Sequence, residues 1–429
     1  MKTTKKIYDS VHRFIHLNAI ERKLINTRPF QRLHYIHQLG VTFFVYPGAV
    51  HRRFEHSLGA MELATRMYEE VFSRGVHRSI ADRLPAVHSP EYAYWRAILR
   101  FSALCHDLGH LPFSHVAEKR LLQDQEHEKW TAKIIQSAYL APIWEAFQKT
   151  LQGSFAGRDI SLDVVKIALG PKKFVALYPD YAPLSSWEKL VSEMLTGDFF
   201  GADRIDYLLR DSQCSGLPYG AFDYHQLFEM LHVLLSDHAL YLGIEENGIE
   251  SCEALLLSRH YMHRRLYQYP TVKAYSFHLA RFMESAFYDI EESLERYLGV
   301  TDNEVLAELQ RASLDIGHPG HFDAACLALR LERFHAFSLK RAVGEEELIA
   351  LREKYRLPVD QIAWELCAKP FQQEELSCPV LCADGSICPA NELSEVSIPT
   401  LPRGWIFVAP QHIDTISAAL AQAGHTAKR

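Results

Sequence analysis

The sequence predicts a mainly helical protein with a small inserted β-hairpin and a small C-terminal α+β lobe. Between residues 18 and 345, apolar side chains recur at three- and four-residue spacing, the pattern of helices that bury one face. Residues 231–246 instead alternate apolar and polar side chains, which is typical of a hairpin. Beyond residue 345, short β-rich runs follow one more helical segment. We therefore expect a helical domain over residues 1–345 and a lobe over residues 346–429.

The individual elements follow from local periodicity. Residues 74–92 contain Pro85, Pro90 and several charges, so we expect a loop there. The periodic segments predict helices at 56–72, 94–105, 128–147, 187–195 and 253–297. In the lobe, the pattern predicts a helix at 345–355, strands at 378–382 and 405–408, and a last helix at 414–423.

Composition limits the classes of partner. The 429 residues are 48% hydrophobic, enough to bury a large core. A net charge of −7 gives no overall attraction for nucleic acid or an anionic membrane, so an anionic ligand would need a local group of cationic side chains. The N-terminus lacks a signal-peptide pattern, and no apolar run approaches the roughly 18 residues of a membrane span. We therefore expect a cytoplasmic protein.

Eight cysteines are scattered over the chain, which is typical of reduced thiols in an intracellular protein. Cys378, Cys382 and Cys388 allow a zinc interpretation. However, they lack paired C-x2-C spacing and surround Asp384-Gly385, a hairpin-turn signal. Cysteines on strands are therefore the favoured interpretation.

The neighbouring residues His106 and Asp107 are the first candidates for metal ligands. They follow the apolar helix predicted at 94–105, and Gly109 and Pro112 should then bend the chain away. A histidine on an apolar helix is usually a core residue, but here other imidazoles lie close in sequence. These are His56, His110, His115 and His127.

Asp203 begins a second candidate segment, in which polar residues share one helical face: Asp203, Asp206, Tyr207, Arg210 and Asp211. A charged face is usually solvated, but the apolar approach at 197–202 favours a buried helix and hence a site. With His56, His106 and Asp107, the carboxylate of Asp203 gives a ligand set that accepts Fe, Mn, Co, Ni, Zn or Mg. Such an ion polarises phosphate oxygens and lowers the pKa of bound water.

Five ordered segments resemble the HD-domain phosphohydrolases, and within them the branch of deoxynucleoside triphosphate triphosphohydrolases (dNTPases). The likeness covers residues 7 to 345, and the segments are 30–40, 45–59, 104–115, 203–211 and 263–268. The resemblance implies a helical HD-domain core, cleavage of a deoxynucleoside triphosphate (dNTP) into deoxynucleoside and inorganic triphosphate, and a homo-oligomer, dimer or tetramer. It also implies a divalent transition metal (Fe, Mn, Co, Ni or Zn), with Mg on the substrate phosphates.

Carried over by position, the resemblance implies a role for each matching residue. His115 would be the general acid and Glu118 its partner. His110 and His127 would lie near the α-phosphate. The implied phosphate contacts are Arg53, Arg204 and Arg259, and the implied metal ligands are His56, His106, Asp107 and Asp203. The deoxyribose would be held by Gln38 and Asp211 and walled by Leu39, Tyr207 and Tyr267, which disfavour a 2′-hydroxyl.

The sequence departs from the branch at one place and leaves alternatives open. Asn26 and His34 replace the aspartate and arginine of a guanine-nucleotide activator site, although Gln31 is kept. Activation by GTP in that manner is therefore not expected. The alternatives are an HD phosphohydrolase acting on another nucleotide phosphate ester, and a regulatory or single-stranded nucleic-acid-binding protein that retains the fold. The net negative charge disfavours the last.

Overall fold

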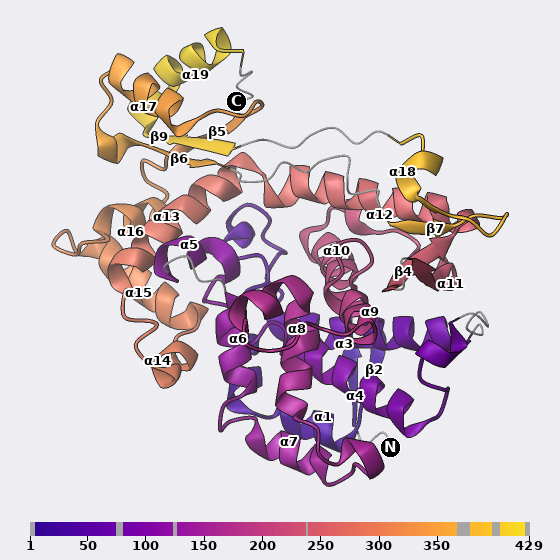
Figure 1. The fold of residues 1–429 in the computed structure, drawn as a ribbon. Coiled ribbons are helices and arrows are strands. Elements are labelled where there is room, and N and C mark those ends of the chain that lie inside the picture. The colour runs from indigo at the N-terminus through magenta and orange to yellow at the C-terminus, as the bar shows by residue number, and fades with distance from the viewer. Residues whose placement is uncertain are drawn as a thin grey trace.

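Helices form the body of the molecule, and strands form three small sheets among the residues described. The computed structural model describes residues 5–73, 80–122, 127–236, 239–366, 378–396 and 404–424. The predicted mainly helical class, with an inserted hairpin and a C-terminal α+β lobe, is confirmed (Figure 1). Within the described ranges, every helix is too short or too polar to cross a membrane.

The chain begins with a β-hairpin that the sequence pattern did not reveal. Strands β1 (Lys5–Asp9) and β2 (Arg13–Leu17) pair antiparallel. Asn18 then caps α1 (Ala19–Ile25) in a reciprocal capping box with Glu21, and α2 (Arg28–Arg32) follows.

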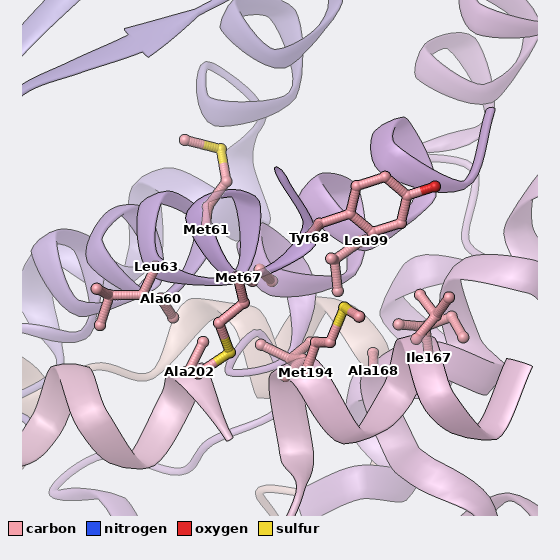
Figure 2. Packing of buried hydrophobic residues seen from close by; sticks show 14 of the residues in the cluster. Ala60, Met61, Leu63, Met67, Tyr68, Leu99, Ile167, Ala168, Met194 and Ala202 are labelled. Atoms are coloured by element: carbon pink, nitrogen blue, oxygen red, sulfur yellow. The ribbon is translucent and has the colours of Figure 1, made fainter. Parts of the chain in front are cut away.

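Five helices build the core around the candidate site. They are α3 (Arg53–Ser73), α4 (Pro90–Cys105), α8 (Ile160–Leu177), α9 (Ser186–Thr196) and α10 (Ala202–Ser215). Figure 2 shows Met67 of α3 close to Met194 of α9 and Ala202 of α10, and all three are fully buried. Truncating such a side chain typically costs about 2–5 kcal/mol, so this packing fixes the start of α10 against α3.

Two long periodic segments are each divided in the structure. Residues 128–147 form α6 (His127–Ile135) and α7 (Ala141–Gln148), and Pro142 lies in the first turn of α7, where its missing N–H costs nothing. Residues 253–297 contain α12 (Ile249–Met262), a π-helical turn (His263–Tyr267), α13 (Pro270–Ala286) and α14 (Leu294–Gly299). The other short or peripheral helices are α5 (Glu118–Leu121), α11 (Tyr224–Glu229), α15 (Asp302–Leu314), α16 (His321–Ala328) and α18 (Ala390–Leu393).

The predicted hairpin is present as β3 (Leu231–Ser236) and β4 (Ala239–Glu245). It is extended by β7 (Pro379–Leu381) and β8 (Ile387–Pro389), which come from the C-terminal part of the chain. Figure 1 shows β7 and α18 beside α12, away from the C-terminal lobe. The three cysteines at 378–388 lie on or next to these strands. The groups of possible metal ligands found in the described part of the chain contain no cysteine.

The C-terminal lobe has its own antiparallel sheet in the order β5 (His335–Leu339), β9 (Gly404–Val408), β6 (Ile362–Leu366). Helices α17 (Glu345–Lys354) and α19 (Ile413–Gln422) supply Leu348, Ile416 and Leu420 to its apolar core. Strand β5 precedes residue 345 but belongs to the sheet of the C-terminal lobe. Strand β7 follows residue 345 but joins the sheet of the inserted hairpin, so each part contributes a strand to the other. The division at residue 345 itself stays a prediction.

Candidate active site

The four residues expected to bind metal come together at the meeting point of α3, α4 and α10. His56 Nε2 lies 3.0 Å from Asp203 Oδ1 and 3.3 Å from His106 Nε2. His106 Nε2 lies 3.3 Å from Asp107 Oδ1 and 3.6 Å from Asp203 Oδ1, and His56 Nε2 lies 3.7 Å from Asp107 Oδ2. Ligand atoms bound about 2.1 Å from one ion lie about 3.0–3.4 Å apart. His56, His106 and Asp107 form a group that fits a divalent cation and whose ligand atoms all lie within 4.8 Å of one another, and Asp203 approaches this group through the two histidines.

Hydrogen bonds behind the two imidazoles orient their ring nitrogens. His56 donates from Nδ1 to Asp206 Oδ2 at 2.7 Å, and His106 donates from Nδ1 to the backbone oxygen of Ala103 at 2.7 Å. Each ring therefore directs Nε2 into the shared space, and a proton on Nδ1 leaves Nε2 as the nitrogen that can bind a metal.

Asp206 belongs to a buried charge network that reaches the N-terminal hairpin. Its carboxylate also binds His12 at 2.6 Å and Arg210 at 2.9 Å, and Arg210 continues to Asp9 at 2.8 Å. Burial raises the pKa of Asp206, but Arg210 and the two histidines lower it more, so that it lies well below its usual range. The carboxylate is thus ionised and able to accept from His56.

Two glycines allow these elements to approach closely. A Cβ at Gly59 of α3 would overlap the carboxylate of Asp206, and one at Gly109 would overlap the backbone of His127 and Thr131. Gly59 therefore permits the contact between α3 and α10. Gly109 permits α6 to pack against the turn that follows Asp107.

Arg53 binds the Oδ2 atom of Asp107. Its NH1 lies 2.6 Å from Asp107 Oδ2, and its Nε donates to Ser114 Oγ at 2.8 Å. Burial raises the pKa of Asp107, but Arg53, His106 and His110 lower it well below its usual range. Arg53 is buried, and its contact with Asp107 orients that carboxylate. A direct contact between Arg53 and a phosphate stays a prediction.

Three histidines surround the carboxylate of Glu118. The Nδ1 atoms of His110, His115 and His127 lie 3.1, 3.0 and 3.1 Å from its oxygens. His115 is exposed over 65% of its side chain, whereas His110 is buried. His110 Nε2 also lies 3.2 Å from Asp107 Oδ1, which joins this cluster to the candidate metal ligands.

The charges in this cluster are set by burial and proximity. Burial raises the pKa of Glu118, but His115, His110 and His127 lower it far below its usual range. Burial, Arg53 and His127 lower the pKa of His110 to about 3, so its imidazole is neutral. An ionised carboxylate between imidazoles is suited to orienting a proton donor, and the four ligand atoms lie within 4.8 Å of one another.

The residues expected around the sugar form a second group. Asp211 is buried and accepts from His51 Nε2 at 2.7 Å and from the hydroxyl of Tyr267 at 2.7 Å. Tyr267 meets Tyr207 edge to face, with ring centroids 6.0 Å apart. Among the described residues, Gln38 Oε1 is buried without a hydrogen-bond partner, which is unusual for a carbonyl oxygen. Leu39 is half-buried against the main apolar core.

Two of the three arginines expected to bind phosphate are brought together by Asp198. Arg204 of α10 binds its carboxylate at 2.8 Å, and Arg259 of α12 donates to its backbone oxygen at 3.0 Å. His263 lies near both guanidinium groups, and burial together with these charges lowers its pKa to about 3. Because the net charge is negative, an anionic ligand would need a local group of cationic side chains, and Arg204 and Arg259 form such a group.

Sequence reasoning missed several residues that support the site. Asp206 was expected on the same helical face as Asp203, but its hydrogen bond to His56 was not predicted. Asp9 and His12 come from a hairpin with no polar pattern, and nothing in the sequence links them to His56. The support that His51 gives to Asp211 likewise depends on folding.

Comparison with known proteins identifies one domain in this chain. Residues 53–168 match the HD domain family. The chain is 31% identical over 284 residues to human "Deoxynucleoside triphosphate triphosphohydrolase SAMHD1", covering 62% of this chain and 42% of that protein. This chain contains an HD domain. The match contains His56, His106, Asp107 and the Glu118 cluster, while Asp203 lies beyond it.

Other relatives of this HD-domain protein include "Uncharacterized protein YwfO" of Bacillus subtilis, 30% identical over 283 residues, covering 66% of this chain and 56% of that protein. The chain spans about half the length of the curated relatives it matches. A hypothetical protein from Aquifex aeolicus of known structure superposes with a TM-score of 0.72 at 26% identity, covering 97% of this chain and 99% of that one. A phosphohydrolase from Bacteroides thetaiotaomicron, at 23% identity, TM-score 0.68 and coverage of 94% and 99%, shares the fold.

Proposed function

We propose that this HD-domain protein is a metal-dependent hydrolase that cleaves dNTPs into deoxynucleoside and inorganic triphosphate. The observation that carries the proposal is the convergence of His56, His106 and Asp107, with Asp203 Oδ1 3.0 Å from His56 and 3.6 Å from His106, beside the histidine cluster around Glu118. The name of the SAMHD1 relatives supports the substrate class.

The four converging side chains would hold a divalent transition metal, Fe, Mn, Co, Ni or Zn, with Mg accompanying the substrate phosphates. When bound, such an ion polarises a phosphate oxygen and makes water a better nucleophile at neutral pH. Arg53 keeps Asp107 ionised and oriented for this task.

Arg204 and Arg259 would offset the charge of the triphosphate. Planar guanidinium groups match phosphate oxygens bidentately, and Asp198 already holds both groups in one region. A substrate phosphate would compete with the exposed carboxylate of Asp198 for Arg204, because a guanidinium binds both kinds of oxyanion.

His115 would donate a proton to the departing 5′ oxygen. Its Nδ1 is bound to Glu118, so Nε2 is the nitrogen that can deliver the proton. An alkoxide is a poor leaving group, and a positioned histidine typically contributes about 10²–10⁴-fold to such a step. His110 and His127 complete the shell of Glu118 and would lie near the α-phosphate.

The sugar would be held through its 3′-hydroxyl by Asp211 and Gln38, whose buried carbonyl oxygen lacks a partner among the described residues. Leu39, Tyr207 and Tyr267 would form the wall beside C2′. The hydroxyl of Tyr267 is fixed on Asp211, so this wall cannot easily retreat from a 2′-hydroxyl. We therefore expect deoxynucleotides to be preferred over ribonucleotides.

The decisive experiment incubates the purified protein with each dNTP and NTP and several divalent metals, and separates the products by ion-exchange chromatography. The expected products are tripolyphosphate and deoxynucleoside. Pyrophosphate or orthophosphate as the sole inorganic product would overturn the proposal. Asp107→Ala should abolish turnover, whereas Asp180→Ala, at an exposed position remote in sequence from the site, should not.

The alternatives have their own signatures in the same experiment. Turnover of nucleoside monophosphates or of cyclic or oligomeric nucleotides without dNTP cleavage would favour a different phosphate ester. Tight, salt-sensitive binding of an oligonucleotide without any turnover would favour a single-stranded nucleic-acid-binding role. The likeness to the dNTPase branch also favours a homo-oligomer, dimer or tetramer, which sedimentation analysis would test.

A further inference from the structure

The π-helical turn His263–Tyr267 separates α12 from α13 and carries Tyr267 at its end. Gln268 closes this turn by donating its backbone N–H to the oxygen of His263 at 2.7 Å. π-Helical turns are rare because the wider backbone is less favourable than an α-helix. Contacts from outside the turn are therefore needed to hold Tyr267 where it meets Asp211.

One such contact comes from the C-terminal lobe. Trp405 of β9 is 1% exposed, and its Nε1 donates to Gln268 Oε1 at 2.9 Å. Gln268 is the neighbour of Tyr267. A second contact comes from the hydroxyl of Tyr46, which donates to the backbone oxygen of Arg265 at 2.6 Å.

The lobe is fixed against α13, so the indole of Trp405 has a defined direction. Phe407 of β9 stacks on Phe277 of α13 with ring centroids 4.6 Å apart and an interplanar angle of 8°. Trp405 and Ala274 belong to the same buried apolar cluster. Figure 1 shows the lobe sheet beside α13, whose first residues follow the π-helical turn directly.

The lobe also reaches the histidine cluster on the other side. Glu365 of β6 lies 3.1 Å from Lys273 of α13 and 3.4 Å from Lys119, the neighbour of Glu118. Burial raises the pKa of Glu365, but the two lysines lower it below its usual value. The lobe thus contacts two elements that carry proposed site residues, α5 and the π-helical turn.

We propose that Trp405 is a positioning residue that holds Tyr267 in its place beside the deoxyribose, by binding Gln268. The effect on substrate rests on the proposed dNTP hydrolysis, whereas the effect on the π-helical turn does not. Loss of the indole N–H leaves the half-buried end of the turn without one of the contacts that hold it in place. The turn then samples other positions, and substrate binding weakens more than the chemical step.

The test compares Trp405→Phe, which removes the N–H but keeps an aromatic ring, with Trp364→Phe as a matched control. Trp364 lies on β6 of the same sheet and packs into the other apolar cluster of the lobe. For Trp405→Phe we expect KM for the dNTP to rise about fivefold, which corresponds to the free energy of one hydrogen bond. We expect kcat to change less than about twofold. Trp364→Phe should change neither.

Gln268→Met provides a second variant that removes the acceptor at a half-buried position. If the two side chains act through their hydrogen bond, the double variant should have the KM of Gln268→Met alone. Additive increases in KM, or a KM for Trp405→Phe equal to that of the control, would overturn the proposal.

Hydrogen exchange without nucleotide separates this inference from the proposed function. Backbone amides of residues 263–268 should exchange several-fold faster in Trp405→Phe than in the wild type. In Trp364→Phe their exchange rates should equal those of the wild type. Equal exchange in all three proteins would refute the positioning role. Absence of dNTP turnover by the wild type would refute the proposed function and leave the exchange result to decide on Trp405.

Discussion

Asp206 accepts a hydrogen bond from Nδ1 of His56 at 2.7 Å, and this contact decides which nitrogen of His56 faces the candidate metal ligands. Asp206→Asn should therefore lower metal affinity by about 10–100-fold, the usual effect of losing such a supporting contact. Competition with a chelating dye would measure the affinity. An unchanged affinity would mean that the remaining packing is enough to orient His56.

Asp107→Ala should lose bound metal and dNTP turnover together, because Asp107 supplies a carboxylate that Arg53 keeps ionised. Elemental analysis of the purified variant would measure the occupancy. Full occupancy would remove Asp107 from the ligand set, whatever its effect on turnover.

Gly59→Ala should destabilise the protein by at least about 1–3 kcal/mol, because the added methyl group has no space beside Asp206. Gly157→Ala is the matched control, since nothing lies within 4 Å of a Cβ at that position. Urea unfolding of both variants would give the free energies. Equal stabilities would show that α3 and α10 can separate without cost.

His115→Ala should lower kcat for dNTPs by about 10²–10⁴-fold while leaving bound metal unchanged, because it removes the acid and no ligand. Bis(p-nitrophenyl) phosphate has a leaving group that needs no protonation, so its hydrolysis should fall far less. Steady-state kinetics with both substrates would measure the two losses. A similar loss for both would contradict the role as general acid.

The pair His51 and Asp211 should make stability depend on alkaline pH. Burial lowers the pKa of His51, but hydrogen bonds to Asp211 and Cys214 raise it more, from its ordinary value of 6.5 to about 9. A raised folded-state pKa stabilises the fold fully below pH 6.5, and this contribution is lost as the pH rises through about 9. The stability difference between wild type and His51→Gln should shrink over that range, by at most about 3 kcal/mol. Urea unfolding at several pH values would measure it, and a constant difference would contradict the pairing.

The local sequence pattern predicted the class of the fold and most residues of the candidate site. The apolar spacing predicted α3, α4 and α9, and the alternation at 231–246 predicted the hairpin, because helices and strands bury one face with different periods. His56, His106, Asp107 and Asp203 could be selected because imidazole and carboxylate groups in apolar segments are costly to bury without a function. Their roles as ligands are a proposal that the geometry supports.

Other features depend on contacts between residues far apart in the chain, and periodicity holds no information about them. The hairpin turn that brings His12 to Asp206 joins positions 194 residues apart, and Trp405 meets Gln268 across 137 residues. Pairing of β7 with β4 likewise unites segments that local pattern assigns to different parts of the protein. The sequence by itself therefore determines which residue types are available to bind a metal. Only the tertiary structure decides which nitrogen of His56 faces the other ligands, because the packing places Asp206 at Nδ1.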